Sequence, residues 1–160
     1  MNGSIILNAT SGRIYKLTLL SRILSAFNIS KIFNGKIPDI TQSVFEYKTI
    51  TIEADIKNSR INLTKTIVDG TDMALTCSGW IDPLNDELDL TCLAAPFKTV
   101  DLIIKKIPIV TTLFGERLIS VPVKATGSFS DPNVIPLHPS AVGKGLVALM
   151  TGLVKYRYNY

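Results

Sequence analysis

The stretch that decides the fold is CSGWIDPLNDELDLTC, residues 77–92. Apolar and polar residues alternate on both sides of Pro83-Leu84-Asn85-Asp86, which is typical of a four-residue turn between antiparallel strands. This turn sets a register in which Ile81 faces Leu88, Gly79 faces Leu90 and Cys77 faces Cys92. Because a slip of one residue would scatter these side chains over both faces, the pattern specifies the register.

Strand periodicity continues on both sides of this hairpin. From about residue 44 the apolar positions alternate with polar ones, and turns are expected at residues 57–60 and 69–70. A long strand is expected from Ile119 to Phe129, closed by Asp131-Pro132. The first residues also resemble the middle of a strand, so we expect the chain to be a piece of a longer protein. Together these segments predict an antiparallel meander.

Other segments carry apolar residues at helical spacing. The predicted helices cover about residues 13–26, 99–115 and 141–156. The first follows a turn expected at Ser11-Gly12, and Arg13, Lys16 and Arg22 share its polar side. With the strands, these helices predict one α+β domain over residues 1–160.

The charges are distributed unevenly along the chain. Residues 1–36 hold five basic residues and no acidic one, and residues 132–160 hold three basic residues and no acidic one. The middle combines the other 9 basic residues with all 13 acidic ones, so its charge is −4 within a total of +4. Aromatic residues do not alternate with basic ones along the strands, and we therefore expect no nucleic-acid partner.

Residue types that support catalysis or metal binding are scarce. His138 is the only histidine, and it lies in a proline-rich connection. One histidine and two cysteines do not supply the usual four zinc ligands, and no phosphate-binding loop is present. We expect no enzyme activity, no cofactor and no metal. No apolar run has the length of a transmembrane helix, and the first residues lack the pattern of a secretory signal.

The predicted hairpin brings Cys77 and Cys92 together. Opposed cysteines of neighbouring strands can form a disulfide in an oxidising compartment, whereas free cysteine is a common small residue of apolar cores. Two buried thiols are the slightly favoured interpretation, and a disulfide is the open alternative.

The order of these elements resembles the C-terminal region of AsmA-like proteins of Gram-negative bacteria. The resemblance covers about residues 3–155. Its motifs are Gly12-Arg13-Ile14 before Leu19-Leu20-Ser21, Asp69-Gly70, Gly79-Trp80-Ile81-Asp82, Pro96, Thr99, Asp101, Ile107-Pro108-Ile109, Pro122-Val123 to Gly127, and Asp131-Pro132.

The resemblance implies a bridge-like lipid transporter. In such proteins a long curved sheet crosses the periplasm, anchored in the inner membrane by an N-terminal helix that this chain does not contain. Phospholipid travels along the apolar face of the sheet toward the outer membrane. The chain would be the C-terminal module and would meet the outer-membrane surface or an outer-membrane protein. Its expected fold is a curved antiparallel sheet with an apolar face partly covered by amphipathic helices.

This hypothesis assigns contacts to particular residues. Those expected to contact acyl chains are Ile50, Ile52, Ala54, Ile81, Leu88, Leu90, Val121, Val123 and Ala125. Those expected near head groups are Arg13, Lys16, Arg22, Lys144, Lys155 and Arg157. Small residues on the apolar face, such as Gly79, leave room for an acyl chain and equally for a packed helix. The alternative function is a non-catalytic scaffold that docks on a periplasmic or outer-membrane partner through its edge strands and apolar helices.

Overall fold

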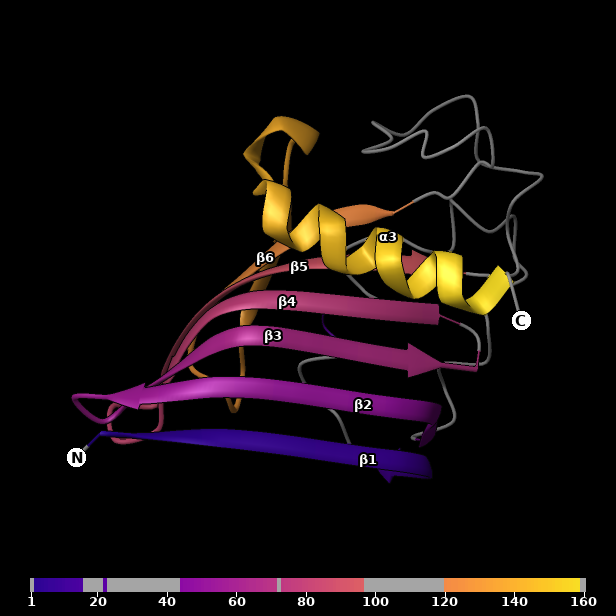
Figure 1. The fold of residues 1–160 in the computed structure, drawn as a ribbon. Coiled ribbons are helices and arrows are strands. Elements are labelled where there is room, and N and C mark those ends of the chain that lie inside the picture. The colour runs from indigo at the N-terminus through magenta and orange to yellow at the C-terminus, as the bar shows by residue number, and fades with distance from the viewer. Residues whose placement is uncertain (1, 16–21, 23–43, 72, 97–119, 159–160) are drawn as a thin grey trace.

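The fold is dominated by one open antiparallel sheet (Figure 1). The computed structural model describes residues 2–15, 22, 44–71, 73–96 and 120–158. Its elements are β1 (Gly3–Tyr15), β2 (Val44–Lys57), β3 (Arg60–Gly70), β4 (Met73–Asp82), β5 (Glu87–Pro96), β6 (Val121–Gly127), β7 (Asn133–Pro136), the 3-10 helix η1 (Pro139–Ala141) and α3 (Lys144–Tyr158). The strands follow chain order in the sheet, with β1 and β7 at its edges. Figure 1 shows the sheet curving and α3 lying across it.

The hairpin of β4 and β5 confirms the predicted register. Cys77 pairs with Cys92, and the predicted four-residue loop separates the two strands. The preceding hairpin turns at Asn58 and Ser59, whose φ angles are 51° and 65°. Positive φ at both central residues matches the twist of the flanking strands, so this short turn is also as the sequence predicts.

The pairing divides the side chains between two faces. We call the face that carries Cys77 and Cys92 the disulfide face and the opposite one the helix face. Helix α3 packs on the helix face, in a buried cluster formed by Ala74, Leu93, Ala95, Leu146, Met150 and Leu153. The predicted C-terminal helix is therefore confirmed, but it covers the face opposite to the cysteines. The two alanines of the sheet allow the helix to approach closely.

Strand β1 extends further than the sequence predicts. The expected turn at Ser11-Gly12 and the helix expected from Arg13 are wrong, because the strand continues to Tyr15 in register with β2. Ser11 has a φ of 51°, yet the strand does not reverse there. Apart from Arg22, which is helical, the remainder of that predicted helix and the one predicted over residues 99–115 lie outside the described residues.

The end of the sheet also differs from the prediction. Strand β6 ends at Gly127, which has a φ of 90°, and not at Phe129. The carboxylate of Asp86 accepts hydrogen bonds from the Ser128 hydroxyl and the Phe129 amide, which holds the chain in a bend. Strand β7 follows this bend and pairs Val134 with Ala125. Strand β7 is not expected from the sequence, because Pro132 precedes it and Pro136 ends it.

Replacement of Thr76 by valine is expected to stabilise the fold. Thr76 lies fully buried on the helix face, and among the described residues its hydroxyl has no hydrogen-bond partner. Thr76→Val removes an unsatisfied buried group and should raise the free energy of unfolding by about 1 kcal/mol in urea denaturation. The matched control is Thr151→Val, which loses a 2.8 Å hydrogen bond to the Val147 carbonyl and should not stabilise. A loss of stability in Thr76→Val would contradict the expectation.

Candidate functional site

The disulfide face is apolar across most of the sheet. Its rows of directly opposed residues include Gly3–Ile56–Ile61–Ile81–Leu88–Gly127, Ile5–Ala54–Leu63–Gly79–Leu90–Ala125–Val134 and Cys77–Cys92–Val123–Pro136. Eight of the nine residues predicted to contact acyl chains lie on this face, since Ile50 and Ile52 continue the β2 alternation. The ninth, Val121, is in β6 and pairs with Ala94. The register therefore brings the predicted positions into one sheet.

Burial divides the predicted residues into two groups. Six of them are at most 8% exposed: Ile50, Ala54, Leu88, Leu90, Val123 and Ala125. Four of these six belong to the buried cluster around the two cysteines. Ile52 and Ile81 are only half-buried. The disulfide face is therefore a packed core over β4 to β6. A ligand could reach this face mainly near β1.

The accessible section of the face lies over β1, β2 and β3. Ile5 and Leu7 are 36% and 45% exposed. On β2 and β3 the side chains of Ile52, Ile56, Ile61 and Leu63 are half-buried, whereas Ala54, opposite Ile5, is buried. We call the set of Ile5, Leu7, Ile52, Ile56, Ile61 and Leu63 the open patch. Of this set only Ile52 is among the residues predicted from the sequence to contact acyl chains. The alternation of residues 3–9 is a signal for Ile5 and Leu7, but the pairing of β1 with β2 skips residues 16–43 and cannot be read from local pattern.

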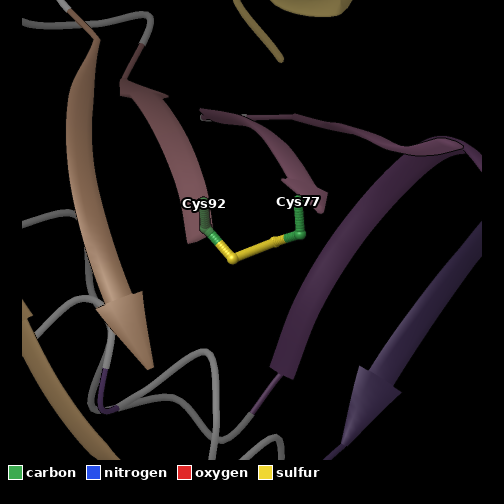
Figure 2. The surroundings of a disulfide bond; sticks show 2 residues. All are labelled: Cys77 and Cys92. Carbon is green, nitrogen blue, oxygen red and sulfur yellow. A yellow bond between two sulfur atoms is a disulfide. The ribbon is translucent and has the colours of Figure 1, made fainter. Parts of the chain in front are cut away.

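Cys77 and Cys92 form a disulfide, so the favoured prediction of two free thiols is wrong. Figure 2 shows the bond joining the two neighbouring strands. The two Cα atoms are 4.1 Å apart, a short distance typical of a pair without mutual backbone hydrogen bonds. Both cysteines are buried, at 4% and 0% exposure. Disulfides of this kind form and persist in oxidising compartments.

Of the cations predicted near head groups, three share α3 and the others lie elsewhere in the chain. Arg13 on β1 donates to the carboxylate of Glu46 at 2.8 Å, and this bond raises the pKa of Arg13. Arg22 pairs with Asp131, and Lys144 is exposed at the start of α3. The other three are Lys155 and Arg157 within α3, and Lys16, which lies outside the described residues. Exposed pairs of this kind contribute little to stability, so these arginines can still exchange partners for an anion.

A polar network closes the β4–β5 hairpin. The buried Asp82 carboxylate accepts hydrogen bonds from the side-chain and backbone nitrogens of Asn85, at 3.0 and 3.2 Å, and from Arg60 Nε at 3.4 Å. The guanidinium of Arg60 also lies 4.1 Å from the centre of the Trp80 ring. The hydrogen bond from Asn85 and the nearby Arg60 charge hold the pKa of Asp82 below its ordinary value of 3.8. The ionised form of Asp82 therefore supports the loop.

Acid is expected to weaken the protein through Asp82. Because folding lowers the pKa of Asp82, its contribution is complete above the unfolded value and is lost as the pH falls through the folded value. The wild type should lose more stability between about pH 5 and pH 3 than Asp82→Asn, as measured by urea denaturation at each pH. If the free energies of unfolding of the two proteins changed in parallel with pH, the ionised Asp82 carboxylate would not stabilise the fold.

The described residues offer little sign of a catalytic or metal-binding site. His138 is exposed between β7 and η1, where its Nδ1 lies 2.8 Å from the Ser140 hydroxyl. In this part of the chain no three histidine, cysteine or acidic side chains converge as metal ligands. The helices described here also include none that is long and apolar enough to cross a bilayer. The open patch remains the feature with the clearest capacity to bind a ligand.

Comparisons with known proteins identify no relative of this chain. No family model, curated protein or solved structure matches the chain.

Proposed function

We propose that this chain is the C-terminal module of an AsmA-like protein that moves phospholipid between the inner and outer membranes. In this proposal acyl chains lie on the disulfide face, and the outer-membrane surface or one of its proteins is the partner. The observation that carries the proposal is the open patch: six apolar side chains from three neighbouring strands that remain accessible on one face. Contiguous exposed apolar surface is costly in water and usually marks a binding site.

The contrast between the two faces supports a lipid ligand. The helix face carries α3 and, beside it, ion pairs between Lys65 and Glu53 at 3.1 Å and between Lys124 and Asp89 at 3.0 Å. The open patch contains no charged residue. A ligand that is apolar along its length and gains no hydrogen bonds, such as an acyl chain, fits the patch better than a polar metabolite does.

The dimensions of β1 are compatible with a phospholipid. Arg13 lies six residues beyond Leu7 on the same strand, a distance of about 20 Å at the rise of an extended chain. One leaflet of a bilayer has a hydrocarbon depth of about 15 Å. Arg13 pairs with Glu46, and the adjacent Phe45 packs in the cluster of the disulfide face, so the Arg13 side chain lies on the helix face. The phosphate of a lipid on the open patch would reach Arg13 around the free edge of β1.

The disulfide supports the proposed compartment. A bond between buried cysteines forms where the chain folds under oxidising conditions, and the periplasm is such a place. This agrees with a periplasmic, membrane-associated protein, as the AsmA-like resemblance implies.

Lipid bound to the purified chain tests the proposal. The chain, secreted into the periplasm of a Gram-negative host, should carry phospholipid detected by native mass spectrometry and by lipid extraction. Ile52→Lys places a charge in the open patch and should reduce the bound lipid at least tenfold, because burying a charge against acyl chains is unfavourable. Leu84→Lys, at a site that is 78% exposed in the β4–β5 loop, is the matched control and should keep its lipid.

The alternative function, a non-catalytic scaffold, predicts a different result for the same purified chain. A scaffold would be free of lipid and would crosslink to one outer-membrane or periplasmic protein, with no effect of Ile52→Lys. That combination would replace lipid transport with docking as the function of this chain.

A further inference from the structure

The outer edge of β1 carries apolar surface beyond the open patch. Three consecutive side chains, Ile5, Ile6 and Leu7, are 36%, 71% and 45% exposed. Ile5 and Leu7 lie on the disulfide face, and Ile6 lies on the helix face, because successive side chains of a strand alternate. An exposed apolar edge strand is a site where a further strand can pair.

The two edges of the sheet differ in how they oppose such pairing. Strand β7 has four residues and ends in Pro136, which has no backbone N–H to donate. Strand β1 has 13 residues, and its residues 3–12 include no proline and no charged side chain. Short length, proline and charge are the features that usually keep an edge strand from pairing. Most of β1 lacks all three.

We propose that in the 160-residue chain β1 pairs antiparallel with β1 of a second copy, with Ile6 on the two-fold axis, at the edge that a preceding strand would occupy in the longer sheet of the proposed function. In this register Ile6 faces Ile6 of the second copy, Ile5 faces Leu7, Ser4 faces Asn8 and Asn2 faces Thr10. Every exposed apolar side chain of the edge then meets another apolar one, and polar residues meet polar residues. No charged residue opposes its equivalent. This self-complementarity is what a two-fold interface between identical chains requires.

The geometry also keeps each face continuous. A two-fold axis perpendicular to the sheet leaves the disulfide faces of both copies on the same side. Ile5 and Leu7 of one copy then lie next to Leu7 and Ile5 of the other. The two open patches form one apolar surface, and the backbone groups on the outer edge of β1 gain partners.

The mass of the purified 160-residue chain in solution tests the proposal. Size-exclusion chromatography with light scattering is run up to about 100 µM, where an interface of micromolar affinity is occupied. The wild type should have twice the mass of one chain. Ile6→Lys brings two ammonium groups face to face and should halve the measured mass. Leu84→Lys makes the same chemical change in the β4–β5 loop and should stay dimeric.

A charge-swap mixture makes the test specific for the register. Ile6→Lys and Ile6→Glu should each be monomeric, and an equal mixture should regain the double mass because opposite charges then face each other. Circular dichroism melting checks that each variant is folded. If a charged variant does not fold, Ile6→Ser, which adds no charge, replaces it in the test. A monomeric wild type, or a dimer that the Ile6 substitutions leave intact, overturns the proposal. Ile6 lies outside the open patch, so lipid binding is scored independently.

Discussion

Replacing Cys77 and Cys92 together by alanine should lower the free energy of unfolding by about 3 kcal/mol. The disulfide spans 15 residues of sequence, and in the chain-entropy description a loop of this length restricts the unfolded ensemble by that amount. The bond also joins β4 and β5 within the buried cluster of the disulfide face, so its loss weakens the centre of the sheet. Urea denaturation of the oxidised wild type and of the double variant measures the difference.

Reduction provides the control for this prediction. Dithiothreitol should shift the denaturation midpoint of the wild type toward that of the double variant and should leave the double variant unchanged. A wild-type midpoint that is the same with and without reductant would mean that the cysteines are thiols, as the sequence analysis favoured. It would also remove the support that the disulfide gives to an oxidising compartment.

The second large effect is expected at Gly79. This residue has a φ of 132°, and an added Cβ would lie 2.0 Å from the carbonyl oxygen of Asp89 on the neighbouring strand. A backbone atom of a central strand pair cannot move aside without breaking the ladder. Gly79→Ala should therefore cost about 3 kcal/mol or more, through backbone strain and steric overlap together.

Gly127 is the matched control for Gly79. It also has a positive φ, 90°, but nothing lies within 4 Å of an added Cβ. Gly127→Ala should cost only the conformational part, about 1 kcal/mol. The difference between the two variants in thermal or urea denaturation isolates the steric contribution. Equal destabilisation would contradict the close approach of Asp89 to Gly79.

Local pattern predicts most of the central sheet because each hairpin is short. The four-residue loop after Asp82 leaves one register that places all apolar residues on one face, and Cys77 opposite Cys92 follows from it. Whether the two sulfur atoms bond depends on the compartment as well as on the register, and periodicity carries no information about the compartment. The sequence therefore predicted the contact and favoured the wrong chemistry.

Long-range pairing explains the larger errors. Residues 13–15 begin a segment whose apolar spacing suits a helix, but they pair with β2 and form a strand. Tertiary contacts override the local preference here. The same pairing creates the open patch, since it sets Leu7 beside Ile52. Helix periodicity likewise predicted the C-terminal helix but could not tell which face of the sheet this helix covers.

The central claim is that phospholipid lies on the disulfide face, and site-specific photocrosslinking tests it most directly. A benzophenone amino acid is placed at position 52, on the disulfide face, or at position 51, whose pairing with Ile67 puts it on the helix face. Ile52 and Thr51 are both half-buried neighbours on β2, so the comparison isolates the face. We predict a phospholipid adduct, identified by mass spectrometry, from position 52 and at most a trace from position 51. Equal adducts from both positions, or none from either, would contradict the account.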